Sequence, residues 1–264
     1  MKTIIFTDLD GTLLHPLTYS YEPALPALQL IRRKNIPLVL CSSKTRAELK
    51  LYQDRLDIGH PFISENGGGI FSPRGYFSSP MEGEAQDDGV KFSLGLAYSR
   101  IRKEFTELRT LLGAAVVGFG DMDARQVAAL TGLPVEEAVL ARMRDFSEPF
   151  VFDGDADPRI FRAFEERGLN WTQGRFYCVM GRHDKGKAVQ MLIRSYRKEH
   201  GKIITIGLGD ALNDLPLLQQ VDHPVLVQKQ DGSYQEHREL AGVRKAPGIG
   251  PQGWNSAVLE LVSP

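Results

Sequence analysis

Residues 8–12 read Asp-Leu-Asp-Gly-Thr and come directly after the apolar run at residues 4–7. That run is too short for a helix and is rich in β-forming residues, which predicts a buried strand. Because side chains alternate along a strand with a period of two, Asp8 and Asp10 leave it on the same side. Gly11 then lets the chain turn away without a side-chain clash. An ordinary surface Asp-Gly turn would also explain this stretch, so a second motif has to decide.

The second acidic motif lies at residues 207–214, which read Gly-Leu-Gly-Asp-Ala-Leu-Asn-Asp and follow a predicted buried strand at 203–206. Asp210 and Asp214 are expected at the strand end and in the first turn of the next helix. If both motifs border one sheet, four carboxylates meet, and two charges about 4 Å apart repel by about 4 kcal/mol. Oxygen-only ligands suit Mg²⁺. Helix capping by Asp210 would explain one aspartate but not all four. The sequence therefore predicts a magnesium site.

Strands and helices alternate on both sides of these motifs. In the first half, strands are predicted at residues 36–41 and 61–64, with helices at 22–35 and 44–58. The alternation resumes after residue 181. The later elements are a helix at 185–200, a short helix at 212–219, a strand at 224–227 and a closing helix around Trp254. This pattern predicts an α/β fold with a Rossmann-like parallel-sheet core.

The segment between the two halves has a different pattern. Residues 79–89 are polar and predict a linker, and a strand is expected at 90–96. Helices and a hairpin-like pair of strands follow before the alternation resumes. The expected organisation is a catalytic core made of residues 1–82 and 183–264, with an inserted α/β cap domain at residues 83–182.

Composition narrows the classes of function. Lys and Arg number 32 and Asp and Glu 33, so the net charge of −1 argues against a nucleic-acid partner. The apolar run at 36–41 is far shorter than the roughly 20 residues of a membrane span, which argues against a membrane partner. Asp8 and Asp10 interrupt any signal-peptide core. Two cysteines, Cys41 and Cys178, exclude a disulfide scaffold and favour a reducing compartment. The expected location is the cytoplasm.

The two acidic motifs resemble the first and last motifs of the haloacid dehalogenase-like (HAD) phosphatase superfamily. The intermediate motifs are similar too, because Ser42 follows the second strand and Lys185 opens the helix after the insertion. The size and position of the insertion resemble the Cof-like branch of that superfamily. Four further stretches are similar to the family of mannosyl-3-phosphoglycerate phosphatases, namely residues 42–48, 61–67, 174–177 and 184–188.

The resemblance implies a Mg²⁺-dependent phosphomonoesterase that converts mannosyl-3-phosphoglycerate to the compatible solute mannosylglycerate and phosphate. Asp8 would attack phosphorus to form an aspartyl-phosphate. Asp10 would protonate the leaving group and then activate water. The implied metal ligands are Asp8, Asp10 through its backbone carbonyl, Asp210 and Asp214.

The substrate is expected to be a small phosphorylated glycoside, and the oligomeric state is left open. The implied phosphate-binding residues are Ser42, Lys185 and Asn213. Arg175 is the first candidate for a substrate carboxylate, since arginine binds carboxylates bidentately. The insertion is expected to act as a lid. Further candidates at the cleft are Ser43, Lys44, Glu65, Asn66 and Gly67.

Other interpretations stay open at this stage. A broader sugar phosphatase or a phosphomutase of the same superfamily would use the same aspartyl-phosphate, whereas a receiver module would be about half this length. Residues 181–187 match the P-loop pattern, but Ala188 stands where the Mg²⁺-binding Ser or Thr belongs. His183 is expected to be a solvated loop residue. Trp171 and Phe176 are expected to pack in a core, with stacking on a sugar as the alternative.

Overall fold

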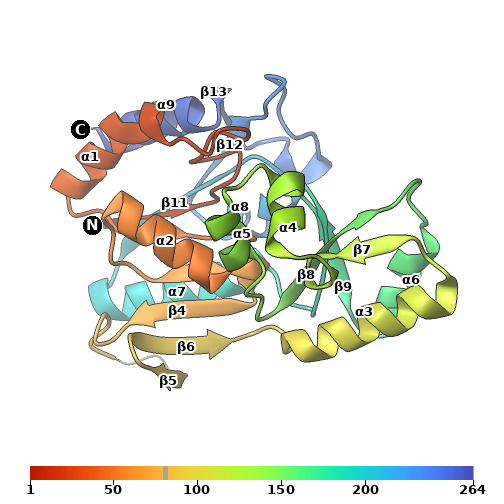
Figure 1. Cartoon of the computed structure of the whole chain (residues 1–264). Helices are drawn as coiled ribbons and strands as arrows, with labels where there is room; N and C mark the ends of the chain where they lie inside the picture. The colour runs from red at the N-terminus through yellow and green to blue at the C-terminus, as the bar shows by residue number, and fades with distance from the viewer. Residues whose placement is uncertain (80–82, 264) are drawn as a thin grey trace.

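A parallel five-stranded sheet lies at the centre of the computed structural model, which describes residues 1–79 and 83–263 (Figure 1). Its strands are β1 (Lys2–Thr7), β2 (Leu38–Leu40), β11 (Ile203–Gly209), β12 (His223–Gln228) and β13 (Arg244–Ile249). The order is β13-β12-β11-β1-β2, and each neighbouring pair is parallel. The predicted α/β class with a Rossmann-like parallel core is therefore confirmed. β13, a polar edge strand, was not predicted.

Helices cover both faces of this sheet because apolar side chains alternate along its strands. Ile5 and Leu40 pack toward α1 (Leu25–Arg33), α2 (Arg46–Leu56) and α9 (Pro251–Val262). Ile4 and Val39 pack on the opposite face against α7 (Lys185–His200) and α8 (Leu215–Leu218). The predicted closing helix is confirmed as α9, in which Trp254 is fully buried. Both faces are thus closed, which leaves the strand ends as the place for a site.

A second, antiparallel sheet continues beside β2 through the bridge between Cys41 and Ile63. It contains β3 (Phe62–Ser64), β4 (Gly69–Pro73), β6 (Gly89–Ser93) and β5 (Glu84–Gln86), in the order β3-β4-β6-β5. The strand expected at 90–96 is found as β6. The linker predicted at 79–89 is wrong over its described part, because β5 and β6 form an edge hairpin there. An edge strand that faces solvent can be polar, which hid β5 in the sequence. Residues 80–82, where the first core segment was expected to end, lie outside the described residues.

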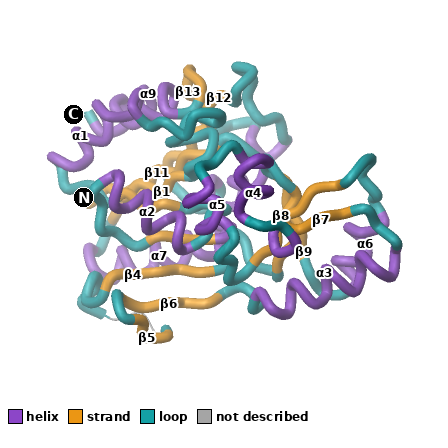
Figure 2. Tube along the Cα trace, in the orientation of Figure 1, coloured by secondary structure: helices purple, strands orange, loops and turns teal. Residues whose placement is uncertain are grey.

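The inserted segment forms a third sheet with helices on both sides (Figure 2). Its antiparallel strands are β7 (Val116–Gly118), β8 (Ser147–Phe152), β10 (Tyr177–Met180) and β9 (Asn170–Gln173), in that order. The helices α3 (Tyr98–Leu112) and α6 (Arg159–Glu166) pack on one face around Phe105, Phe150 and Phe164. The helices α4 (Ala124–Thr131) and α5 (Val135–Ala141) contain Val127 and Ala138 of a separate apolar cluster. An inserted α/β cap domain is therefore confirmed.

Side-chain contacts join this cap to the core near α2. The Thr45 hydroxyl donates to the carbonyl of Leu140, and Arg55 forms an ion pair with Glu137 of α5 at 2.6 Å. Figure 1 shows α5 lying beside α2. Among the described residues, no helix combines the length and the apolarity that a membrane crossing needs.

Candidate active site

The two acidic motifs meet at the carboxyl ends of β1 and β11. Thr7 pairs with Leu208, and the backbone N–H of Asp8 donates to the carbonyl of Leu208 at 2.9 Å. Carboxylate oxygens of Asp8, Asp210 and Asp214 lie within 4.8 Å of one another. The neighbouring strands therefore bring together side chains that are about 200 residues apart in the sequence.

Gly11 allows the close approach of the two motifs. Its φ is +83°, in the region that favours glycine, and a Cβ there would lie 2.6 Å from Oδ2 of Asp210. Thr12 donates to Oδ1 of Asp210 at 2.8 Å, which fixes the orientation of that carboxylate. Residues 11 and 12 of the first motif thus support the second motif directly.

Lys185 is the single cation inside the acidic cluster among the described residues. It opens α7, its side chain is fully buried, and Nζ donates to Oδ1 of Asp8 and to Oδ1 of Asp214, both at 2.6 Å. Burial alone would lower the pKa of Lys185, but the carboxylates of Asp214 and Asp8 raise it. Burial and the charge of Asp214 raise the pKa of Asp8, and the same two causes raise that of Asp210 to about 7. One ammonium group therefore does not balance three carboxylates.

This imbalance and the oxygen donors fit a hard divalent cation such as Mg²⁺. Asp8 and Asp210 border a cavity, so their oxygens are accessible to an ion. Asp214 is fully buried, and its Oδ2 accepts the backbone N–H groups of Asp210 and Ala211 at 3.0 and 3.1 Å. Asp214 thereby holds the loop that presents Asp210, while Asp8 and Asp210 are the donors that border the cavity.

Asp10 lies beside Asp8 and also borders the cavity. Its Oδ2 is 3.0 Å from Nζ of Lys44, and its Oδ1 is buried without a hydrogen-bond partner among the described residues. Lys44 is buried, lies 5.2 Å from the ring centre of Tyr19, and also pairs with Glu48 at 3.5 Å. Burial alone would lower the pKa of Lys44, but the charges of Asp10 and Glu48 outweigh it and raise the pKa above its ordinary value. Lys44 thus fixes Asp10 as well as bordering the cavity.

Three predicted phosphate or substrate contacts lie nearby. Ser42 is fully buried, and its Oγ accepts the backbone N–H of Lys44 at 3.3 Å. Nδ2 of Asn213 donates to Oδ1 of Asn66 at 3.2 Å, and both side chains border the cavity. Oδ1 of Asn213 is buried without a partner among the described residues. This pair supplies polar atoms for a ligand close to Asp8 and Asp10.

The cavity measures about 640 Å³ and lies between the acidic cluster and the cap. Its volume is in the range of small-molecule sites. The core contributes Asp8, Ser43 and Lys44, and the cap contributes Arg144 and residues 172–176. A ligand bound at Asp8 would therefore contact both parts of the chain.

Arg175 borders the cavity, but its side chain is exposed and already forms hydrogen bonds with other residues of the protein. Its Nη1 donates to the hydroxyl of Tyr19 at 2.7 Å, and its Nη2 donates to the carbonyl of Leu130 at 3.4 Å. Phe176 borders the cavity and packs edge-on against Phe119. Trp171 packs against Phe161 with a ring-centre distance of 4.2 Å. The structure places Trp171 outside the cavity lining and Phe176 within it.

Glu65 does not line the cavity. The side chain is fully buried, Oε1 accepts the N–H of Asp145 at 2.7 Å, and Oε2 accepts the N–H of Phe146 at 2.9 Å. Gly67, also named as a substrate contact, has a φ of +96°, and a Cβ there would lie 2.1 Å from the carbonyl oxygen of Asp184. Both residues hold backbone segments together, so we do not retain them as substrate contacts.

The expectation of a solvated His183 is wrong. The side chain is 2% exposed, and Nε2 forms a hydrogen bond of 3.1 Å with the carbonyl oxygen of Glu65. Burial lowers the pKa of His183 to about 4. The loop before α7 packs beneath the turn of Glu65, which the polar sequence around residue 183 did not indicate.

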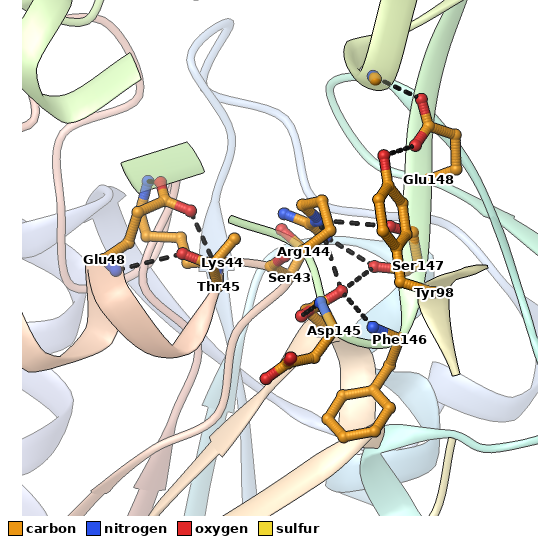
Figure 3. Close-up of polar contacts among 12 residues, drawn as sticks. Ser43, Lys44, Thr45, Glu48, Tyr98, Arg144, Asp145, Phe146, Ser147 and Glu148 are labelled. Atoms are coloured by element: carbon orange, nitrogen blue, oxygen red, sulfur yellow. Dashed lines mark hydrogen bonds and ion pairs between the residues drawn. The ribbon is translucent and has the colours of Figure 1, made fainter. Parts of the chain in front are cut away.

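Arg144 is a buried cavity residue that the sequence did not single out (Figure 3). Nε lies 3.3 Å from Oε2 of Glu65, and Nη2 donates to the carbonyl of Ser43 at 3.0 Å. The residue follows α5 in a short polar stretch, so its pairing with Glu65, 79 positions earlier in the sequence, has no local signal.

Comparison with known proteins agrees with this architecture. A family model described as haloacid dehalogenase-like hydrolase matches residues 5–94 and 159–237. The chain belongs to this family. It is 47% identical to a glucosyl-3-phosphoglycerate/mannosyl-3-phosphoglycerate phosphatase of Methanococcoides burtonii, over 99% of this chain and 98% of the relative. It is 35% identical to a mannosyl-3-phosphoglycerate phosphatase of Pyrococcus horikoshii, over 86% of this chain and 91% of the relative.

Solved structures share the fold at low identity. A protein of Thermoplasma acidophilum superposes with a TM-score of 0.71 at 18% identity, covering 99% of this chain and 98% of the other. A HAD subclass IIB sugar phosphatase superposes with a TM-score of 0.64 at 16% identity, with the same coverage. These similarities support the core-and-cap fold, and the activity has to be argued from the site.

Proposed function

We propose that this chain is a Mg²⁺-dependent phosphomonoesterase that hydrolyses a phosphorylated glycoside, with mannosyl-3-phosphoglycerate as the first candidate. The observation that carries the proposal is the grouping of Asp8, Asp10, Asp210 and Lys185 at one end of a large cavity. The names of the relatives, one of them 47% identical over nearly the whole chain, support a glycosyl-3-phosphoglycerate as substrate.

Asp8 is the proposed nucleophile. Its carboxylate oxygen attacks phosphorus, the bond from phosphorus to the ester oxygen breaks, and an aspartyl-phosphate forms. Lys185, 2.6 Å from Oδ1 of Asp8, favours the ionised carboxylate against the effect of burial. The covalent intermediate divides one difficult displacement into two easier ones.

Asp10 is the proposed proton donor and acceptor. In the first step it protonates the leaving alkoxide, and in the second it removes a proton from the water that attacks the aspartyl-phosphate, which releases phosphate and restores Asp8. Lys44 holds Oδ2 of Asp10 at 3.0 Å, while Oδ1 has no hydrogen-bond partner among the described residues and is the proposed atom for the proton transfer. The position of Asp10 at the cavity wall suits both roles.

Lys185, Ser42 and Asn213 are the proposed phosphate-binding residues. Lys185 donates to Asp8, Asn213 borders the same cavity as Asp8, and Ser42 precedes the cavity residue Ser43. Mg²⁺ would be held by Asp8, Asp210, Asp214 and the carbonyl of Asp10, and would reduce the repulsion between the anionic nucleophile and a phosphate dianion.

We propose that residues 83–182 form the cap and residues 1–82 and 183–264 the core. Within that range, β6 pairs with β4 and β5 pairs with β6, so the part from α3 to β10 is the unit that can move over the cavity. Its closure would exclude water from the aspartyl-phosphate until the leaving group has departed. A cytoplasmic location is part of the proposal.

The proposal is tested by phosphate release from mannosyl- and glucosyl-3-phosphoglycerate, with Mg²⁺ and with a chelator, beside a panel of hexose phosphates. We expect Mg²⁺-dependent release with a higher kcat/KM for the phosphoglycerates than for the hexose phosphates. Transfer of phosphate to an added sugar acceptor would indicate a phosphomutase. Faster hydrolysis of hexose phosphates would indicate a broader sugar phosphatase.

A further inference from the structure

Arg144 is a buried cation of the cap that contacts Ser43 and Glu65 of the core and borders the same cavity as Asp8 and Asp10. Its side chain is 4% exposed, and it lies between the cap strand β8 and the loop that contains Ser43 (Figure 3). The proposed catalytic steps do not use it. A buried arginine at the wall of a ligand cavity needs a reason, because burial of a guanidinium is costly unless its charge and donors are used.

The protein fixes one side of the guanidinium. Nε lies 3.3 Å from Oε2 of Glu65 and from the carbonyl of Ser147. Nη2 donates to the carbonyl of Ser43 at 3.0 Å and to Oγ of Ser147 at 2.6 Å. Glu65 is itself held by backbone N–H groups of the cap and by Oγ of Ser147. The group is therefore oriented before any ligand arrives, which reduces the entropic cost of binding.

The other side of the guanidinium remains for a ligand. Nε and Nη2 carry all the hydrogen bonds that the Arg144 side chain makes to the residues the structure describes, so Nη1 is the nitrogen that remains. Arg144 borders the same cavity as Ser43, Lys44 and Asp8. A molecule whose phosphate lies at Asp8 can therefore reach Arg144 without leaving the cavity.

We propose that Arg144 binds the carboxylate of a phosphoglycerate and so selects carboxylated phosphate esters. This inference rests on the proposed function, because it names the residue that recognises the glyceryl part of that substrate. Arginine suits this role, since its guanidinium stays charged and the two N–H groups of Nη1 can donate to a carboxylate. Arg175 is the weaker candidate, because it is exposed and its two terminal nitrogens already contact Tyr19 and Leu130.

The experiment compares two inhibitors of p-nitrophenyl phosphate hydrolysis that differ only in the carboxylate. These are 3-phosphoglycerate and glycerol 3-phosphate, whose inhibition constants are measured in wild type, Arg144→Gln and Arg144→Lys. We expect Arg144→Gln to raise the inhibition constant of 3-phosphoglycerate by about 10- to 100-fold. The rise for glycerol 3-phosphate should be at least tenfold smaller. Arg144→Lys should recover part of the selectivity.

The matched control is Arg142→Gln, which removes an exposed arginine two positions away and should change neither constant. Because Arg144→Gln leaves the carboxylate of Glu65 buried without its cation, that variant can unfold. The double variant Glu65→Gln, Arg144→Gln removes both charges of the pair, which is often tolerated. In that variant, the ratio of the inhibition constants of 3-phosphoglycerate and glycerol 3-phosphate tests the proposal in the same way.

Equal weakening of both inhibitors, or no weakening of either, would overturn the inference. Its failure is separable from that of the proposed function. If the enzyme hydrolyses glycosyl-3-phosphoglycerates but the Arg144 variants keep the inhibitor selectivity of wild type, the inference about Arg144 is wrong and the proposed function stands. Arg144-dependent selectivity in an enzyme that does not hydrolyse those glycosides would support the inference and reject the proposed substrate.

Discussion

Replacement of Lys185 by methionine tests whether the acidic cluster needs a cation to be stable. Methionine has a similar length and no charge, so it removes both ion pairs of 2.6 Å and leaves Asp8 and Asp214 buried without compensation. We expect the metal-free variant to be strongly destabilised at pH 8. The loss should be smaller at pH 5, because Asp8 and Asp210, whose pKa values are raised, then take up protons and the repulsion within the cluster falls.

The magnitude follows from the distances and the burial. At an effective dielectric constant of about 20, each ion pair at this separation is worth about 6 kcal/mol before desolvation. Removal of one partner of a buried ion pair typically costs about 3–5 kcal/mol. For a chain of this size, that corresponds to a fall in Tm of about 10 °C. Mg²⁺ should reduce the difference between variant and wild type, because a bound cation replaces part of the missing charge.

The assay is urea unfolding at pH 8, with a chelator and with Mg²⁺. Lys187→Met is the matched control, since Lys187 lies on the same helix with a side chain that is 59% exposed. Loss of its ion pair with Asp184 should change stability by about 0.5 kcal/mol or less. A Lys185→Met variant that loses less than about 1 kcal/mol in the chelator, or loses equally with Mg²⁺, would refute the electrostatic reasoning.

Three further changes test other parts of the site. Asp10→Asn should lower kcat for an alkyl phosphate by about 10²–10⁴-fold. It should also give a burst of nitrophenol from p-nitrophenyl phosphate in rapid-mixing kinetics, because this leaving group needs no proton. The absence of a burst, together with an undiminished rate, would exclude Asp10 as the acid–base residue. Gly11→Ala places a Cβ 2.6 Å from Oδ2 of Asp210 at a φ of +83°, so calorimetry should detect weaker Mg²⁺ binding, and wild-type affinity would contradict the packing argument. Burial lowers the pKa of His183 from its ordinary value of 6.5 to about 4, so the stability of the neutral, buried imidazole is complete above pH 6.5 and is lost as the pH falls through 4. In urea unfolding, His183→Gln should remove up to about 3 kcal/mol of this dependence of stability on pH. Parallel curves of stability against pH for variant and wild type would contradict this role of His183.

The core of the fold was predictable because its signals are local. The aspartates at residues 8, 10, 210 and 214 follow short apolar runs, and parallel strands place their carboxyl ends at one edge. The structure brings three of these carboxylates and Lys185 together as the motifs indicate. The limits of the strands were less predictable: the strand expected at 36–41 is only Leu38–Leu40.

The parts that sequence reasoning missed depend on contacts between distant segments. β13 and β5 are polar edge strands, which lack the apolar pattern of buried strands. Glu65 resembled a cleft residue, yet its carboxylate accepts the N–H groups of residues 145 and 146 in the cap. His183 lies among charged residues but is covered by the turn at Glu65. No periodicity within one segment reports such tertiary pairings.

The rate of phosphate release from mannosyl-3-phosphoglycerate by Asp8→Asn, with Mg²⁺ and beside wild type, is the most direct test of covalent catalysis by Asp8. We expect a loss of at least about 10⁴-fold, because asparagine cannot form the aspartyl-phosphate. The Tm should stay near that of wild type, because asparagine keeps the size of the side chain and Lys185 keeps its ion pair with Asp214. Release at close to the wild-type rate would contradict the assignment of Asp8 as nucleophile and the mechanism built on it.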